Sequence, residues 1–307
     1  MAANLMLYHR LRSALLLPFM TLFLFACVTA VGEPEQPRLL AVQVQQEHAP
    51  SAPHDLLRVA TLNIAHGRGD SLNQLLVSRS RITENLDTIA HFLDREKIDV
   101  VALQEADAES AWSGNFDHTR HLAASSGYRW WVQDSHARLG IANYGTALLS
   151  SSPITAAAAL SFEPSPPTAR KGFTVAEIQW QTASGEVHAI DVISVHMDFS
   201  RHSVREQQGR EMNKVMQNRH NPMIIMGDFN SESLARRLVE QAASNQRHLH
   251  TWDGLGAQEA TYKDKRLDWI ILSGELAFVD HRAATDVLSD HRAVVATIRY
   301  RETTAQN

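Results

Sequence analysis

From residue 56 onward, short apolar runs alternate with longer segments in which apolar residues recur every three or four positions. The runs LLRVATLNI (residues 56–64) and DVVAL (residues 99–103) have the length and composition of buried strands. Similar runs predict strands at 129–133, 145–150, 173–180, 187–195, 223–227, 267–272 and 293–300. Helical spacing predicts helices at 79–96, 116–126, 203–218 and 232–243.

The order and character of these elements favour an α/β fold with two sheets. Strands outnumber helices, and many strands are apolar throughout, which is typical of strands buried on both faces. No glycine-rich nucleotide-binding fingerprint follows a strand. We therefore predict two packed sheets with helices outside rather than one Rossmann sheet.

The first 26 residues have the layout of a signal peptide. Two arginines precede the apolar run SALLLPFMTLFLFA, which is short for a bilayer span and is interrupted by Pro18. The sequence LFAC, ending at Cys27, resembles the bacterial lipobox, in which the cysteine becomes a lipidated N-terminus. A plain signal peptide cleaved near Ala30 and an uncleaved membrane anchor are the alternatives.

The remaining sequence divides into a linker, one domain and a tail. Residues 27–54 contain four prolines and little apolar periodicity, which predicts a linker. The domain is predicted at residues 55–302 and the tail at 303–307. We expect an exported protein of the cell envelope, a monomer held on the membrane through lipidated Cys27.

Composition limits the chemistry. Of the 307 residues, 44% are hydrophobic and 21% are charged, which is ordinary for a globular protein. A net charge of −5 disfavours binding of nucleic acid by general attraction, so nucleic acid is considered only as a substrate. Because Cys27 is the only cysteine, the chain has no internal disulfide and no thiolate zinc site.

Polar side chains follow or precede many of the predicted strands. These residues are Asn63, Gln104, Glu105, His196, Asp198, Asp228, Asn230, Asp268, Asp290 and His291. Each alone is also explained as a turn former, and Asp198 as a cap or a partner of a site residue. As a set they suit a hard cation such as Mg²⁺ or Ca²⁺ at the rim of a sheet. His66, beside Asn63, is expected to be exposed, with a place in the cleft as the alternative, and His281 is expected to be exposed.

Seven motifs occur in a fixed order over residues 57–300. They are ATLNIAHG, ALQEAD, YGTALLS, ISVHMD, MGDFNS, RLDWIILS and SDHRAV. In this order they resemble the endonuclease/exonuclease/phosphatase superfamily, which has the deoxyribonuclease-I-like fold. The resemblance implies a four-layer α/β sandwich with two mixed sheets and metal-dependent hydrolysis of phosphoesters. Members of the superfamily cut DNA or RNA, repair abasic sites, or act on phosphoinositides and sphingomyelin.

The resemblance also implies roles for individual residues. Glu105 holds the metal, with Asn63 close by, and Asp228 orients or deprotonates the attacking water. Asn230 holds water or a phosphate oxygen. His291 contacts the phosphate and shares a proton with Asp268. The remaining implied residues are Asp290 as a ligand or as the orienter of His291, His196 as a proton donor, and Tyr144 and Lys171 at the substrate.

These expectations converge on an enzyme. We expect an exported phosphodiesterase dependent on Mg²⁺, with Mn²⁺ or Ca²⁺ as alternatives, that acts on a lipid headgroup or a small phosphoester. The alternatives are an extracellular or periplasmic nuclease and a non-catalytic binding lipoprotein. Export and His196, which many abasic-site repair relatives lack, both disfavour DNA repair.

Overall fold

The computed structural model describes residues 36–244, 247–254 and 259–301. The predicted signal peptide, Cys27 and the C-terminal tail lie outside these ranges. Within them, no helix combines the length and hydropathy needed to cross a bilayer. The described residues belong to one compact unit that begins at Gln36.

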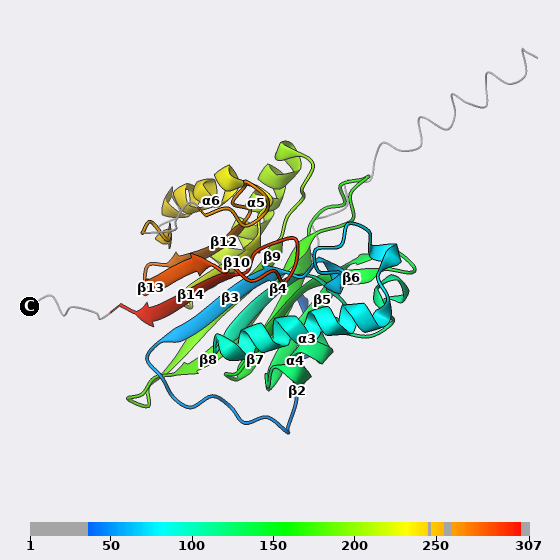
Figure 1. Cartoon of the computed structure of the whole chain (residues 1–307). Helices are drawn as coiled ribbons and strands as arrows, with labels where there is room; N and C mark the ends of the chain where they lie inside the picture. Colours follow the sequence, from blue (N-terminus) through cyan, green and yellow to red (C-terminus); the bar gives the residue numbers. More distant parts are fainter. Residues whose placement is uncertain (1–35, 245–246, 255–258, 302–307) are drawn as a thin grey trace, which may run out of the picture. The chain divides into compact units, whose positions relative to one another are not determined.

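Two seven-stranded mixed sheets form the centre of this unit (Figure 1). In sheet A the strand order is β1 (Arg38–Leu39), β7 (Ile154–Ser161), β8 (Gly172–Gln181), β9 (Val187–His196), β10 (Met223–Asp228), β12 (Asp268–Ser273) and β11 (Leu249–Thr251). In sheet B it is β13 (Leu276–Ala283), β14 (Val294–Tyr300), β3 (Leu57–Asn63), β4 (Val100–Asp107), β6 (Asn143–Ser150), β5 (Trp130–Arg138) and β2 (Gln43–Val44). Apolar residues from both sheets, including Val59, Val100, Val192 and Ile224, pack into one buried layer.

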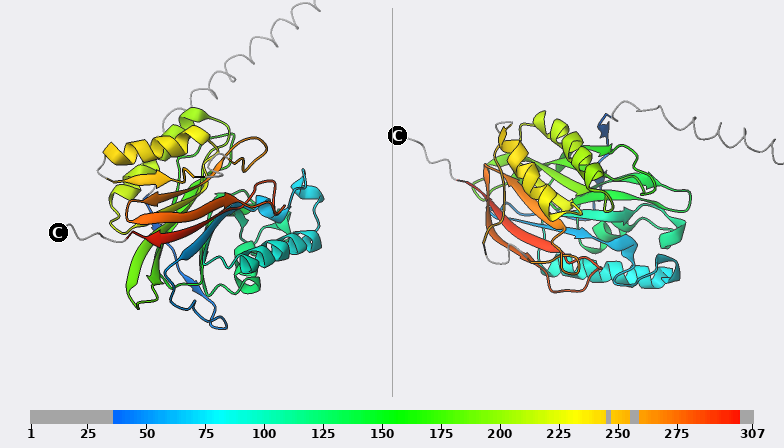
Figure 2. Two further views of the ribbon diagram at one scale, coloured as in Figure 1. Left: turned by 60° about the vertical axis from the view of Figure 1, so that its left-hand side comes forward. Right: turned by 90° about the horizontal axis from the view of Figure 1, so that it is seen from above.

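Helices cover the outer faces of the sheets (Figures 1 and 2). α3 (Arg79–Arg95) and α4 (His118–Ser125) pack on sheet B through a second apolar cluster. α5 (His202–Gln217) and α6 (Glu232–Ser244) pack on sheet A through a third. The three clusters separate four layers, so the prediction of a four-layer α/β sandwich with two mixed sheets is confirmed.

The helix α3 shows how sequence sets these layers. Ser78 accepts a hydrogen bond from the backbone N–H of Arg81 and so caps the first turn. Ile82, Leu86 and Leu93 recur at helical spacing and are all buried against sheet B. Their burial fixes the face that α3 presents to the sheet.

The structure differs from the sequence prediction at the N-terminal edge. The linker prediction is wrong for residues 38–54, because β1 pairs with β7 and β2 pairs with β5. His54 also accepts a hydrogen bond at its carbonyl from the indole N–H of Trp180. The edge strands β5 and β7 have unpaired backbone groups, and pairing satisfies them without any apolar pattern in the added strand. The domain therefore begins at Gln36 rather than at residue 55.

Candidate active site

One transverse row of sheet A brings most of the predicted residues together. Gly172 pairs with His196, His196 with Asp228, and Asp228 with Asp268. Residues in one row project from the same face of a sheet, so the three polar side chains converge. Lys171, immediately before β8, lies beside this row.

Gly227 allows the central strand of this row to approach its neighbour. It has φ 148°, and a Cβ atom there would lie 2.0 Å from the carbonyl oxygen of Val195 on β9. Only glycine fits such an approach between two backbones. The residue thus sets the position of Asp228, which follows it.

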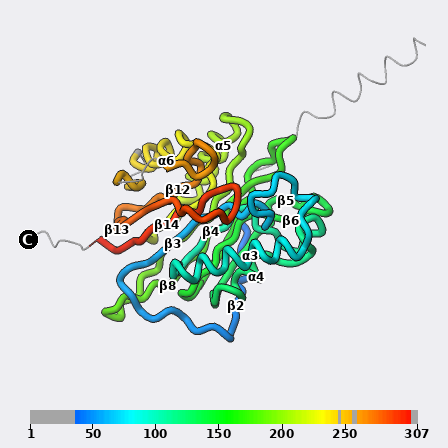
Figure 3. The backbone as a smooth tube through the Cα atoms, in the orientation of Figure 1, coloured from blue at the N-terminus to red at the C-terminus, as the bar shows by residue number. Residues whose placement is uncertain are grey.

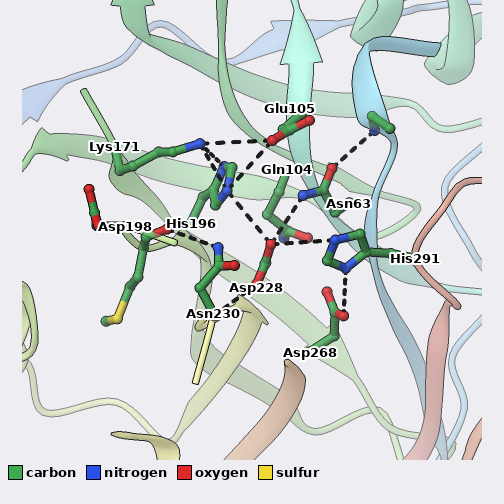
Figure 4. A network of polar contacts seen from close by, with 12 residues as sticks. Asn63, Gln104, Glu105, Lys171, His196, Asp198, Asp228, Asn230, Asp268 and His291 are labelled. Atoms are coloured by element: carbon green, nitrogen blue, oxygen red, sulfur yellow. Dashed lines mark hydrogen bonds and ion pairs between the residues drawn. The ribbon is translucent and has the colours of Figure 1, made fainter. Parts of the chain in front are cut away.

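Sheet B supplies the opposite wall. Asn63 ends β3 and pairs with Gln104 on β4. The register of β4 shifts between Gln104 and Ala106, and Glu105 at this bulge has φ 51°. A bulge changes the direction of the side chain it carries. Gln104 Nε2 donates to Ser194 Oγ across the sheets at 3.1 Å, while Glu105 lies beside Lys171 and His196 in the site (Figure 4).

Asp228 lies at the centre of the site (Figure 4). Its Oδ2 accepts a hydrogen bond from Asn63 Nδ2 at 3.1 Å, and its Oδ1 accepts one from the backbone N–H of Asn230 at 2.8 Å. Nε2 of His196 lies 3.6 Å from Oδ2, and Nε2 of His291 lies 3.9 Å from it. Burial raises the pKa of Asp228 to about 7, with His291 opposing the shift and Asp268 reinforcing it.

His291 forms a close pair with Asp268. Its Nδ1 lies 2.8 Å from Asp268 Oδ2. Burial alone lowers the pKa of His291, but the carboxylates of Asp268 and Asp228 outweigh burial and raise it to about 10. The ring therefore carries a positive charge at neutral pH and can donate from Nε2 into the site.

His196 has the opposite electrostatic character. Lys171 Nζ lies 3.0 Å from its Nε2, and both side chains are buried. Burial and the Lys171 ammonium lower the pKa of His196 well below 6.5. Burial also lowers the pKa of Lys171, although Glu105 and Asp228 favour its charged form. The site thus holds one cationic and one neutral imidazole on opposite sides of Asp228.

His66 is a site residue that the sequence analysis assigned to the surface. It is buried, with Nε2 3.1 Å from Glu105 Oε2 and Nδ1 2.7 Å from Asp107 Oδ1. Asp107 in turn accepts hydrogen bonds from Trp112 Nε1 and Ser113 Oγ. Burial lowers the pKa of His66, but the two carboxylates outweigh burial and raise it to about 9. The signal available in the sequence was the motif NIAH, in which His66 lies three residues beyond the end of β3.

Tyr144 extends the wall around His66. Its ring lies 4.5 Å from the His66 ring and stacks on Trp112 at 5.8 Å. Burial and the nearby carboxylates Glu105 and Asp107 raise the pKa of Tyr144 to about 12. Tyr144 is therefore a packing neighbour of His66.

Two further predicted positions, Asn230 and Asp198, have clear contacts. Asn230 has φ 50°, and its Nδ2 donates to the carbonyl of Met197 at 3.0 Å. Asp198 is buried and accepts hydrogen bonds from the backbone N–H groups of Ser200 and Arg201, which fixes the loop after β9. Hydrogen bonds thus outweigh burial and lower the pKa of Asp198 to about 2.

Asp290 forms an ion pair with an arginine. Its Oδ2 pairs with Arg68 at 2.7 Å, and the orienting contact of His291 goes to Asp268 instead. Of the two roles predicted for Asp290, the orienting of His291 is wrong, because Asp268 holds that ring; the role of a metal ligand stays a prediction. His281 was also expected at the surface, but it is buried beside Trp252.

The donor set fits a hard cation. Among the residues described, Asp228, Asp268 and His291 each offer a ligand atom within 4.8 Å of one another. Asp268 Oδ1 is buried and has no hydrogen-bond partner within the described part of the chain. Glu105 Oε1 lies 3.8 Å from Lys171 and from His196, beyond hydrogen-bond distance. These oxygens are the type of ligand that Mg²⁺ prefers.

Comparisons with known proteins agree on one family. The model of the Endonuclease/Exonuclease/phosphatase family matches residues 60–291. An endonuclease/exonuclease/phosphatase family protein from Leptotrichia buccalis superposes with a TM-score of 0.60, at 20% identity, over 80% of this chain and 100% of that one. The human Nocturnin catalytic domain superposes with a TM-score of 0.60 at 18% identity, over 85% of this chain and 98% of that one. The mannosyl-6-phosphatase of Bacteroides thetaiotaomicron superposes with a TM-score of 0.60 at 14% identity, over 80% of this chain and 100% of that one. No curated protein sequence matches significantly.

Proposed function

The chain belongs to the endonuclease/exonuclease/phosphatase family, and we propose that it is an exported phosphodiesterase acting on a lipid headgroup or another small phosphoester. Members of the family are phosphoric ester hydrolases that generally depend on a divalent metal. For this chain we propose in addition the phosphodiester substrate, the export and the roles of the site residues.

One observation carries the proposal. Asp228 Oδ2 has the Nε2 atoms of His196 and His291 within 3.9 Å, one ring on each side. A phosphate between these rings would meet two imidazole nitrogens while a water molecule lies on the Asp228 carboxylate. This arrangement would hold a base and two phosphate-binding groups at one phosphoester, as its hydrolysis by water requires.

Asp228 is suited to act as the base. Its pKa of about 7 allows it to take a proton from water near neutral pH. Hydrogen bonds from Asn63 and from the backbone of Asn230 hold both carboxylate oxygens in place. A positioned base of this kind contributes roughly 10²–10⁴-fold to the rate.

The two histidines and Lys171 are suited to bind the phosphate. Cationic His291, held by Asp268, donates to one phosphate oxygen. The Lys171 ammonium supplies a second positive charge. His196 is neutral in the free enzyme, and the negative charge of a bound phosphate raises its pKa, so that it can receive a proton and pass it to the leaving oxygen.

The residues that would hold a divalent cation are Glu105 and Asn63, with Oδ1 of Asp268, unpaired among the described residues, as a further oxygen donor. When bound, such an ion polarises the phosphoryl oxygen and offsets the charge that develops on it. We propose Mg²⁺ as the ion, because the donors are oxygen atoms of carboxylates and an amide.

The test is a panel assay with Mg²⁺. The substrates are bis-p-nitrophenyl phosphate, sphingomyelin, phosphoinositides, plasmid DNA and RNA, and the matched variants are Asp228→Asn and the surface change Asp87→Asn. The proposal expects hydrolysis of a small or lipid phosphodiester that D228N abolishes and D87N retains. Preferential cleavage of plasmid or RNA would replace it with the nuclease alternative. Absence of hydrolysis across the panel would refute it.

Export is tested separately through Cys27. If Cys27 is lipidated, the protein partitions with membranes and resists extraction by high salt, and Cys27→Ser leaves a larger precursor. A soluble wild-type protein that begins downstream of Cys27 would contradict the lipoprotein assignment.

A further inference from the structure

Two short segments near the site expose large apolar side chains. The segment around η2 (Gln74–Leu76) carries Leu72, Leu75 and Leu76, and the turn between β5 and β6 carries Leu139 and Ile141. Their relative exposures range from 56% to 102%, which is high for leucine and isoleucine. We call these five residues the apolar rim.

The two segments adjoin each other (Figure 3). η3 (Ala111–Ser113) lies between them: Gln74 Nε2 donates to the Trp112 carbonyl at 3.4 Å, and the Trp112 backbone N–H donates to the Ile141 carbonyl at 3.2 Å. The exposed side chains therefore form one neighbourhood rather than scattered single residues. An exposed apolar patch of this kind marks an interaction site.

The apolar rim continues directly from the walls of the site. Tyr144, three residues after Ile141, contacts His66, which contacts Glu105. In the loop after β9, Phe199 follows His196 by three residues and is also more than half exposed. Apolar side chains thus project at the end of the molecule where the catalytic residues lie.

The N-terminal segment enters the domain at the same end. Arg38 pairs with Ala159 in antiparallel register, so residues before Arg38 run toward the end of β7. β7 ends at Ser161, which pairs with Gly172, and Gly172 pairs with His196. Cys27 is nine residues before Gln36, a stretch that spans at most about 30 Å. A lipid anchor at Cys27 would therefore keep the site end of the domain within reach of the membrane.

Charge at the apolar rim also suits a lipid surface. Arg138 adjoins Leu139 and is 70% exposed on its side chain. A basic side chain beside exposed leucines matches the headgroup region above the acyl chains.

We propose that the apolar rim docks on a lipid bilayer and presents the active site to phosphoesters at the membrane surface. As a statement about substrate, this rests on the proposed function. Docking itself requires only the apolar rim, so it is measured without turnover.

The test is vesicle flotation of the domain beginning at Gln36, which contains both sheets and the whole described core but not Cys27. Vesicles contain phosphatidylcholine with and without phosphatidylglycerol. The triple variant L75S/L76S/I141S is compared with V187S, which removes an apolar side chain that is 52% exposed at the opposite end of β9 from His196. Circular dichroism and thermal unfolding establish that each variant is folded.

Wild type and V187S should float with vesicles, and the triple variant should bind at least about tenfold more weakly, since three apolar side chains no longer enter the bilayer. Hydrolysis of soluble bis-p-nitrophenyl phosphate should be equal in all three. Failure of wild type to float, or equal flotation of the triple variant, would overturn the docking proposal. A dimer in sedimentation that only the triple variant abolishes would also overturn it, in favour of a second copy as the partner. Loss of soluble hydrolysis in wild type would instead refute the proposed function.

Discussion

Nε2 of His66 lies 3.1 Å from Oε2 of Glu105, so one oxygen of this carboxylate is fixed while the other faces the site. Oδ1 of Asp107 lies 2.7 Å from Nδ1 of the same ring, on the side away from Glu105, and fixes its orientation. The ring is charged at neutral pH because two carboxylates raise its pKa to about 9 against the effect of burial. His66 is therefore placed to orient Glu105 without touching substrate.

The change His66→Asn should weaken binding of Mg²⁺ or Mn²⁺ by about 10- to 100-fold, the usual effect of losing a partner behind a metal ligand. Calorimetric titration of the metal measures this without turnover. The surface change His121→Asn, which removes a pair with Asp87, should leave metal affinity at the wild-type value. Equal metal affinity in H66N and wild type would exclude an orienting role.

The second prediction concerns Asp268. Asp268→Asn keeps the shape of the side chain but removes the charge that holds His291 as a cation, so kcat should fall by about 10²–10⁴-fold. Combining it with His291→Ala should cost less than the product of the two single effects, because both changes act on one phosphate contact. Strictly multiplicative losses in the cycle would show that the two residues act independently.

The third prediction concerns the metal. Excess chelator should abolish hydrolysis, and Mg²⁺ should restore it, because the buried carboxylates need a cation to accept an anionic phosphate. Glu105→Gln keeps the volume of the side chain and should lower both metal affinity and rate. Full activity in excess chelator would end the metal-dependent mechanism for this chain.

The fourth prediction concerns Lys171. Lys171→Met removes a buried ammonium beside His196, so KM for a phosphodiester should rise by about 10- to 150-fold, the equivalent of one charged hydrogen bond of about 1.5–3 kcal/mol. Inorganic phosphate should lose inhibitory strength in parallel. Lys214→Met on the surface of α5 provides the matched control. An unchanged KM and phosphate inhibition would remove Lys171 from the substrate site.

The fifth prediction concerns stability and pH. His136 lies between the sheets, where its ring contacts Thr146 and Ser161, and burial lowers its pKa to about 4. The folded pKa is below the unfolded value of 6.5, so the contribution of neutral His136 is fully present above pH 6.5 and is lost as pH falls from 6.5 toward 4.

Protonation of His136 should lower the protein's free energy of unfolding by about 2 kcal/mol between pH 7 and pH 5. His136→Gln should remove that share of the pH dependence, while other groups such as His281 keep theirs. Urea unfolding of both proteins at the two pH values measures the difference in slope. Parallel slopes would show that His136 is not held neutral in the folded protein.

Periodicity predicted the two-sheet fold because its strands are long, apolar and separated by clear turns. Two long strands were missed for identifiable reasons. β7 contains the run TAAAALS, whose small side chains lack the β-branched signal of a strand. β13 has partly exposed positions over most of its length, which hides its alternation. The short edge strands β1 and β2 are held by backbone pairing, which leaves no pattern in side chains.

At the site, the sequence predicted which strand ends converge but not the direction of each side chain. Glu105 and His66 both have positive φ values, 51° and 56°, and such local geometry does not follow from residue type. His66 was assigned to the surface because nothing nearby in the sequence indicated that Asp107 would receive its ring. Asp290 was expected as a ligand or as the orienter of His291, and the second role fails because its carboxylate pairs with Arg68 while Asp268 holds the ring.

The hydrogen bond from Gln104 to Ser194 joins the two sheets directly beneath the catalytic residues. Asn63 and Glu105 come from one sheet, and His196, Asp228 and Asp268 come from the other. The rate of hydrolysis therefore depends on how the two sheets are aligned with each other. Gln104→Leu should let the two sheets shift by a fraction of an ångström, so kcat should fall while the circular dichroism spectrum keeps its native shape.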